Sequence, residues 1–188
     1  MVKLNKIYTR TGDDGSSGLV DGSRVSKSGL RMTAIGEVDE ANAALGLAIA
    51  EFTPGGDLTE HLQGIQNDLF DLGADIATPG EFEVGLRIVE SQVERLELAI
   101  DAMNAELEPL QSFILPGGSK AVAALHLART VVRRAERAAV ALNASEPLNP
   151  QLLAYLNRLS DLLFVTARYV AAKEGGDILW RPGATRDQ

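Results

Sequence analysis

The residues with the clearest chemical potential lie near the N-terminus, where residues 9–19 read TRTGDDGSSGL. The glycines of this stretch allow the backbone to bend and to approach a ligand closely, and its amides and hydroxyls could donate to phosphate oxygens. Arg10 and the later Lys27 add positive charge. These residue types predict a phosphate-binding head, with a mobile N-terminal arm as the alternative. The glycine and hydroxyl candidates are Thr9, Thr11, Gly12, Gly15, Ser16, Ser17 and Gly18.

Two aspartates, Asp13 and Asp14, lie inside this head. They could hold a magnesium ion bound to a nucleotide, because Mg²⁺ prefers oxygen ligands and is usually shared with phosphates. The head is not a Walker loop, because the pattern GxxxxGK[ST] is absent from the sequence. The stretch LPGGSK at residues 115–120 has the wrong spacing and follows no predicted strand.

A second group of candidate residues lies in ARTVVRRAER, residues 128–137. On a helix Arg129, Arg133 and Glu136 project within about 60° of one another, with Arg137 beside them. The planar guanidinium of arginine suits phosphate oxygens and stays charged at pH 7. This pattern predicts a phosphate-binding stripe, and a solvated helix face with ion pairs between residues four apart is the alternative.

Polar side chains also interrupt the last apolar stretch of the chain. Asn157, Asp161, Phe164 and Arg168 fall on one stripe of a helix that is otherwise apolar on nearly all sides, so most of its faces are expected to be buried. Buried polar groups need partners, so the stripe either contacts a neighbouring helix or faces a ligand. Asn157 can donate and accept, which fits a purine edge or a ribose as well as an interhelical bond.

Hydrophobic periodicity predicts the elements that position these residues. Apolar residues recur in steps of three and four over residues 58–76, 93–107 and 122–142, which is typical of amphipathic helices. Two more helices are expected within 36–52 and 149–176, the latter with Asn149 as N-cap, Pro150 at its first position and Gly175 and Gly176 as its end. The expected breaks are residues 53–57, 78–85, 109–118 and 144–150.

The sequence therefore predicts an all-α protein, a five-helix bundle of up-down helices with no sheet. We expect a single domain over residues 1–188, divided into an irregular head (1–32), the helical bundle (33–174) and a short irregular tail (175–188). The length of 188 residues is compatible with one such domain.

Composition excludes several function classes. The 18 basic and 26 acidic residues give a net charge of −8, which argues against nucleic-acid binding. The absence of cysteine excludes disulfides, thiolate metal sites and a cysteine nucleophile. No apolar run approaches a membrane span and no secretory signal opens the chain, so we expect a cytoplasmic protein without membrane contact. His61 and His126 stand alone, which favours packing over catalysis.

Six collinear blocks resemble the PduO-type ATP:cob(I)alamin adenosyltransferases. The blocks are IYTRTGDDGSSGL, RVSK, GEVDEANAALG, IQNDLFDLGADIATP, FILPGGSKAVAALHLARTVVRRAER and YLNRLSDLLFVTAR, in order across nearly the whole chain. The resemblance implies a five-helix bundle that assembles as a homotrimer with active sites between subunits. It also implies transfer of the 5′-deoxyadenosyl group of ATP to the cobalt of a reduced corrinoid such as cob(I)alamin, which gives adenosylcobalamin and triphosphate, with Mg²⁺ as cofactor.

The same resemblance implies roles for individual residues. Arg133 would act directly in transfer, and Asp39 would pair with Arg129 of a neighbouring subunit. Phe113 would press on the lower face of the corrinoid and displace its axial ligand, with Phe164 and Trp180 as further corrinoid contacts. The ATP-binding set would be Thr9, Arg10, Thr11, Gly12, Asp13, Gly15, Ser17, Gly18, Lys27, Arg133, Arg134, Glu136, Arg137 and Asn157.

This chain departs from the family pattern in two places. Many members carry lysine where this chain has Asp14, and Trp180 lies in the least general part, so it is either a lid or an anchor for the tail. A reductase and an adenosylcobalamin-dependent acceptor enzyme are expected partners.

The sequence also raises two rival functions. The first rival is a helical oligomerisation or adaptor module. The second, a carboxylate-bridged di-metal bundle, would need paired Glu-x-x-His motifs, and the sequence has none.

Overall fold

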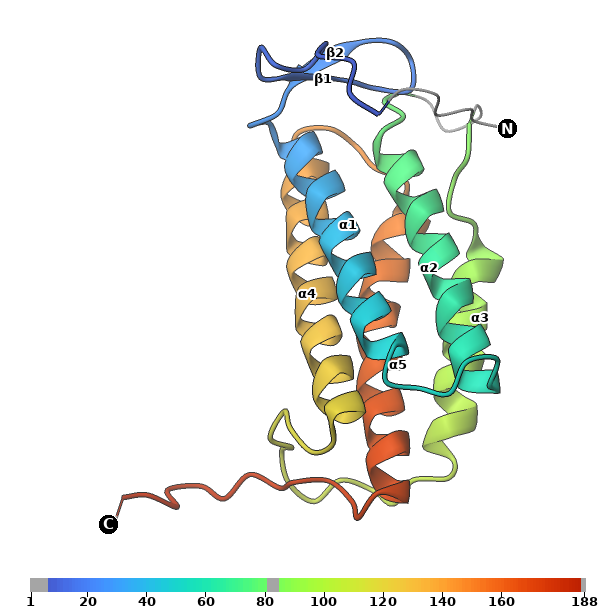
Figure 1. Ribbon diagram of the computed structural model, residues 1–188, viewed down its shortest axis with the longest axis vertical. Coiled ribbons are helices and arrows are strands. Elements are labelled where there is room, and N and C mark those ends of the chain that lie inside the picture. Colours follow the sequence, from blue (N-terminus) through green and yellow to red (C-terminus); the bar gives the residue numbers. More distant parts are fainter. Residues whose placement is uncertain (1–6, 81–84, 187–188) are drawn as a thin grey trace.

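A computed structural model of the chain describes residues 7–80 and 85–186, and Figure 1 shows five helices side by side in one bundle. Helix α1 packs against α2 and α4, and α5 packs against α3 and α4. The predicted five-helix, all-α bundle is confirmed. The helices are α1 (Leu30–Ile49), α2 (Asp57–Ile76), α3 (Glu90–Asn104), α4 (Lys120–Asn143) and α5 (Pro150–Lys173).

The core of the bundle follows the hydrophobic seams that predict it. In α2 the seam positions Leu62, Ile65, Leu69, Leu72 and Ile76 are all buried. Helix α5 buries side chains around most of its circumference, because α3 and α4 pack against it. A helix that is apolar on most sides gains from burial on most sides, so α5 is the central element.

Helix α1 begins earlier than its sequence pattern indicates. The prediction started the helix at Gly36, whereas the structure starts it at Leu30. The cause is a tertiary anchor, because the buried guanidinium of Arg31 donates to the carbonyl of Ile76 and to the carboxylate of Glu146. Long-range contacts of this kind leave no periodic trace in the local sequence.

The head is not wholly irregular, so that prediction was wrong. Strands β1 (Ser16–Gly18) and β2 (Arg24–Ser26) form a short antiparallel hairpin. Gly22, at φ 85°, occupies the left-handed conformation that its turn requires. Three-residue strands are too short to show alternating hydrophobicity, which is why the sequence did not reveal them.

The N-terminus of α5 is held by a buried polar network. Asn149 is the N-cap, as predicted, because its side-chain oxygen accepts from Gln151 N–H at 3.1 Å. Its Nδ2 donates to the Asp75 carboxylate and to the Ile88 carbonyl, both at 2.8 Å. Asp75 in turn accepts from Arg87. One asparagine thereby joins α5 to the end of α2 and to the segment before α3.

The far end of α5 also matches its predicted signals. Pro150 is the first helical residue, and Gly175 and Gly176 follow the helix with φ values of 111° and 96°. These left-handed conformations favour glycine at a helix end.

Within the described ranges, no helix combines the length and the hydropathy that a bilayer span requires.

We expect Asn149→Ala to lower the free energy of unfolding by about 2–4 kcal/mol, because it removes a helix cap and leaves the Asp75 carboxylate and the Ile88 carbonyl short of a donor. Urea unfolding followed by circular dichroism measures this loss. The matched control is Asn104→Ala at the exposed end of α3, which should change stability by less than about 0.5 kcal/mol. Equal losses in the two variants would contradict the anchoring role of Asn149.

Candidate functional site

Two arginines on α4 have no carboxylate partner among the described residues. Arg129 and Arg133 lie one helical turn apart, about 6 Å along the axis. The Nε of Arg129 is buried without a hydrogen-bond partner, and its guanidinium lies 5.9 Å from the centre of the Phe164 ring. Burial, and then the charge of Arg133, lower the pKa of Arg129. A buried donor without a partner and two adjacent cations favour an anionic ligand or partner at this position.

The acids around this stripe are bound to other groups. Glu136 accepts from the side-chain amide of Asn157 at 2.9 Å rather than from an arginine. Arg134, which the resemblance assigns to ATP, forms ion pairs with Glu37 and Glu40 of α1, and these contacts raise its pKa. The stripe is therefore not a self-neutralised helix face, and its geometry gives Arg134 a role in packing α4 against α1.

The side-chain amide of Asn157 bridges α4 and α5. It donates to Glu136, and its oxygen accepts from Arg158 at 3.1 Å. Arg158 is held in turn by Glu97 at 2.8 Å. Asn157 is exposed, so this fixed amide presents a donor and an acceptor edge beside the arginines. Arg137 lies along the helix and donates to the Arg133 carbonyl at 2.9 Å.

The glycine-rich head is braced by two cations. Lys27 Nζ donates to the Gly12 carbonyl at 2.8 Å. Arg24, which the sequence analysis missed, donates to the Thr11 carbonyl at 2.5 Å and to the Ser16 hydroxyl at 2.6 Å. A Cβ on Gly12 would lie 2.9 Å from the Ser16 carbonyl oxygen and 3.1 Å from Lys27 Nζ, so this turn has room only for glycine. No local pattern in the sequence marks Arg24, because its place on β2 opposite β1 appears only in the structure.

The two aspartates of the head differ in their surroundings. The Asp14 carboxylate accepts from the amide and the hydroxyl of Ser16 at 2.9 and 2.7 Å, and these hydrogen bonds, more than the charge of Arg24, lower its pKa. Asp14 therefore caps a turn of the head. Asp13 is exposed, and its carboxylate makes no hydrogen bond or ion pair with the rest of the described chain.

The head does not meet the arginine stripe within one chain. Figure 1 shows the β1–β2 hairpin beyond one end of the bundle, near the first residues of α1. A hydrogen bond joins the hairpin to the helical part. It runs from Val20 N–H to the carbonyl of Ala77, the residue after α2, at 3.1 Å. No hydrogen bond or ion pair joins residues 9–29 to α4 or α5. The two halves of the predicted phosphate site are thus separate in the single chain.

Asp39 lies on a different face from Arg129, and no ion pair joins them within the chain. Asp39 is exposed on α1, beside a groove of about 440 Å³ between α1 and α2. Phe70 lines the same groove with 71% of its surface exposed. An exposed aromatic ring next to a free carboxylate is typical of a surface that another protein covers.

Two of the predicted corrinoid contacts belong to the connection between α3 and α4 and to the C-terminal tail, which run at the opposite end of the bundle from the hairpin (Figure 1). Phe113 and Trp180 pack edge to face with ring centres 6.0 Å apart. They are 77% and 44% exposed and line a hollow of about 420 Å³. Phe164 is half-buried and lies 6.3 Å from the ring of His126, which is buried on α4.

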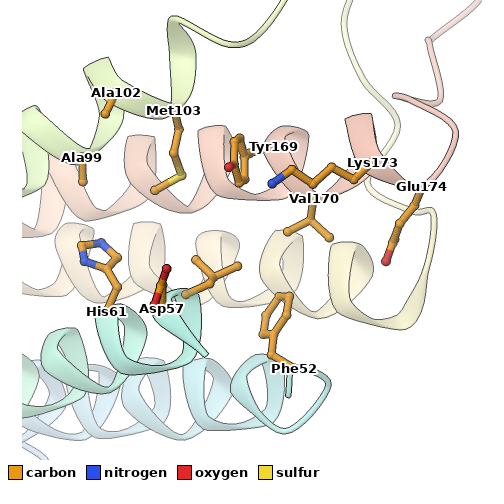
Figure 2. A pocket seen from close by; sticks show the side chains of 11 residues that line it. Phe52, Asp57, His61, Ala99, Ala102, Met103, Tyr169, Val170, Lys173 and Glu174 are labelled. Atoms are coloured by element: carbon orange, nitrogen blue, oxygen red, sulfur yellow. The ribbon is translucent and has the colours of Figure 1, made fainter. Parts of the chain in front are cut away.

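A further apolar pocket contains none of the predicted site residues. It measures about 590 Å³ and lies between α2, α3 and α5, with His61, Met103 and Tyr169 in its wall (Figure 2). Lys173 Nζ lies 3.7 Å from the centre of the Tyr169 ring. Burial, and then the charge of Arg95, lower the pKa of His61. Both histidines are thus held in packed surroundings, as expected.

Residues 7–170 match the family model for cobalamin adenosyltransferases. The chain is 53% identical to the corrinoid adenosyltransferase of Mycobacterium tuberculosis (strain ATCC 25618 / H37Rv), over 98% of this chain and 97% of that protein. It is 49% identical to the corrinoid adenosyltransferase of Bacillus subtilis (strain 168), over 95% and 94% of the two chains. A solved structure from Lactobacillus reuteri, a PduO-type ATP:corrinoid adenosyltransferase variant complexed with cobalamin and ATP, superposes with a TM-score of 0.88 at 38% identity, covering 94% of this chain and 99% of that one.

We expect Arg133→Gln to raise the free energy of unfolding slightly, by about 0.3–0.5 kcal/mol, because it removes the repulsion of Arg129 by a like charge four residues away. Urea unfolding at fixed protein concentration and low salt measures this gain, which 0.5 M salt should largely remove. Arg158→Gln is the control and should be destabilising, because Arg158 has carboxylate partners. A loss of stability in Arg133→Gln would mean that Arg133 has a structural partner.

Proposed function

Since the chain belongs to the cobalamin adenosyltransferase family, we propose how its residues transfer the 5′-deoxyadenosyl group of ATP to the cobalt of a reduced corrinoid. The chain is an ATP:corrinoid adenosyltransferase, and its products are adenosylcobalamin and triphosphate. One observation carries the assignment of residues: Arg129 and Arg133 form a cationic stripe on α4 that no acid of the described chain neutralises.

The chemistry explains why no nucleophilic side chain is needed. Cobalt(I) attacks C5′ of ATP, the cobalt–carbon bond forms as the C5′–oxygen bond breaks, and triphosphate leaves with the electron pair. The protein has to align C5′ with cobalt, neutralise the leaving triphosphate and exclude water. Arginines, a lysine and backbone amides perform the second task, which matches the residue types gathered in the head and on α4.

We assign the triphosphate to the head and to Arg133. In the head Lys27 now donates to the Gly12 carbonyl, and it would exchange that carbonyl for a phosphate oxygen when ATP binds. Asn157 and Glu136, already joined by a hydrogen bond, would bind the adenosine through the free edges of their side chains. The remaining proposed ATP contacts are Thr9, Arg10, Thr11, Gly12, Asp13, Gly15, Ser17, Gly18, Arg134 and Arg137.

Mg²⁺ would accompany the triphosphate. The head offers the hard oxygen ligands that Mg²⁺ prefers, and its Asp13 carboxylate has no partner among residues 7–80 and 85–186, so the donor set fits the ion. Mg²⁺ would neutralise part of the phosphate charge when bound. No group of three or more His, Asp or Glu side chains in the described ranges forms a metal cage of its own, which is consistent with an ion shared with the nucleotide.

We propose a homotrimer in which the head of one subunit covers the arginine stripe of the next. This arrangement would join the two halves of the site that lie apart within one chain. It would also bring the exposed Asp39 to Arg129 of the neighbour and supply a partner for the buried Arg129 Nε. The groove beside Asp39, with its exposed Phe70, would lie in the same interface.

The corrinoid would bind at the aromatic end, against Phe113, Trp180 and Phe164. The exposed ring of Phe113 would press on the lower face of the corrinoid and displace its axial ligand. An open axial position raises the cobalt(II)/cobalt(I) potential, so that a reductase can reduce cobalt(II) to the cobalt(I) nucleophile. We further propose a cytoplasmic location, with a reductase and an adenosylcobalamin-dependent acceptor enzyme as partners.

An anaerobic assay with chemically reduced cobalamin, ATP and Mg²⁺ tests the function directly. We expect the parent protein to form adenosylcobalamin and triphosphate, and Arg133→Ala to lower kcat by about 10²–10³, because one positioned charge at the leaving group is lost. Lys120→Ala, which removes an exposed cation from the same helix, is the control and should retain activity.

A parent protein that binds ATP but never alkylates cobalt would contradict the assigned reaction. A folded Arg133→Ala variant with full activity would leave the reaction in place and contradict the role of the stripe.

Charge reversal tests the proposed interface. We expect Asp39→Arg to weaken the trimer, because like charges would meet at Arg129, and the double variant with Arg129→Asp to restore it. Sedimentation velocity over a range of protein concentrations measures the assembly state. Asp101→Arg, at an exposed position of α3, is the control and should leave assembly unchanged. If the parent, Asp39→Arg, the double variant and Asp101→Arg all form trimers of equal stability, the ion pair between Asp39 and Arg129 is excluded.

A further inference from the structure

The C-terminal tail pairs with the connection between α3 and α4 at the aromatic end of the bundle. Residues 177–180 run antiparallel to residues 112–115 through an isolated bridge between Ile114 and Leu179. Three hydrogen bonds at 2.8–3.0 Å join the two segments, so they move as one unit. The bonds are Leu115 N–H to the Ile178 carbonyl, Trp180 N–H to the Phe113 carbonyl, and the Ser112 hydroxyl to the Trp180 carbonyl.

A single buried arginine holds the beginnings of both segments. Arg168 Nε donates to the Asp177 carboxylate at 3.0 Å, and its Nη2 donates to the Glu108 carbonyl at 2.8 Å. The Arg168 and Asp177 side chains are only 8% and 16% exposed. Asp177 starts the tail segment that ends in Trp180, and Glu108 starts the loop that leads to Phe113. The Arg168 guanidinium thus contacts both stretches of chain, one just before Trp180 and one just before Phe113.

Hydrophobic burial is not the only anchor of the tail. Ile178, Leu179 and Trp180 are each nearly half exposed, so they gain only part of the free energy that full burial would give. The Asp177 carboxylate adds a polar anchor on α5 through Arg168, and its charge opposes the lowering of the His126 pKa that burial and then Arg129 cause. Breaking a buried ion pair leaves an uncompensated charge, so Asp177 is a strong attachment of the tail to the bundle.

We propose that Arg168 and Asp177 form a latch that clamps the tail against residues 112–115 and thereby positions Phe113 and Trp180 as one aromatic contact for the corrinoid. The proposal rests on the proposed function, since it concerns the corrinoid end of that site. Both are positioning residues, because they act through the two rings. The hollow of about 420 Å³ beside the rings, lined by Leu110, Gln111 and Ser112 as well, is the space that the latch keeps in shape.

The chain has one tryptophan, so its fluorescence reports the latch without reference to activity. We expect Asp177→Asn to shift Trp180 emission to longer wavelength and to increase its quenching by iodide, because the tail detaches. The KM for the corrinoid should rise about tenfold or more, with the KM for ATP unchanged, since a misplaced contact weakens alignment at one substrate only.

The matched control is Glu174→Gln, which removes an exposed carboxylate three residues before Asp177. It should change neither the Trp180 fluorescence nor the KM for the corrinoid. Arg168→Lys should give an intermediate effect, because lysine reaches one acceptor but lacks the fork that spans two. Asp177 lies outside the helices, so circular dichroism should show an intact bundle in its variant.

Unchanged Trp180 emission and iodide quenching in Asp177→Asn would overturn the latch, whether or not the protein alkylates cobalt. A loosened Trp180 with an unchanged KM for the corrinoid would overturn its positioning role. Failure of the parent to make adenosylcobalamin would instead contradict the proposed function, and the fluorescence comparison would still decide the latch.

Discussion

The proposed site depends on two adjacent arginines that have no acid partner in the described part of the chain. The chain carries 26 acidic residues and a net charge of −8, yet Arg129 and Arg133 have no carboxylate partner among the described residues. Their neighbour Glu136 is bound to Asn157, and Arg134 takes the acids of α1. Packing that keeps two like charges together sacrifices some stability, which is typical of a site prepared for an anion.

The bundle supplies the rigidity that such a site requires. Helix α5 is buried on most sides, and Asn149 fixes its N-terminus to α2 and to the segment before α3. The Asn157 amide is therefore held in place beside the stripe on α4. At the other end Arg168 connects the same helix to the two segments that carry the exposed rings. On the proposed function, one central helix thus orients groups for both substrates.

The sequence predicts the helices well because their signals are local. Seam positions such as Leu62 and Leu69 and the cap Asn149 lie where periodicity and capping rules place them. The early start of α1, the hairpin of the head and the pairing of the tail with residues 112–115 depend on long-range contacts, which leave no periodic pattern. The same limit applies to the site: residue types identify the arginine stripe, whereas the roles of Arg24 and Arg168 emerge only from their partners.

Subunit complementation tests the central claim, that the head of one chain completes the stripe of another. Lys27→Ala and Arg133→Ala chains, each inactive alone, would be mixed, dissociated and reassembled, and adenosylcobalamin formation measured. Random assembly would place an intact head against an intact stripe at about a quarter of the interfaces, so the account predicts that substantial activity returns. Mixed oligomers that stay inactive, although mass spectrometry confirms that they contain both chains, would show that head and stripe must belong to one chain.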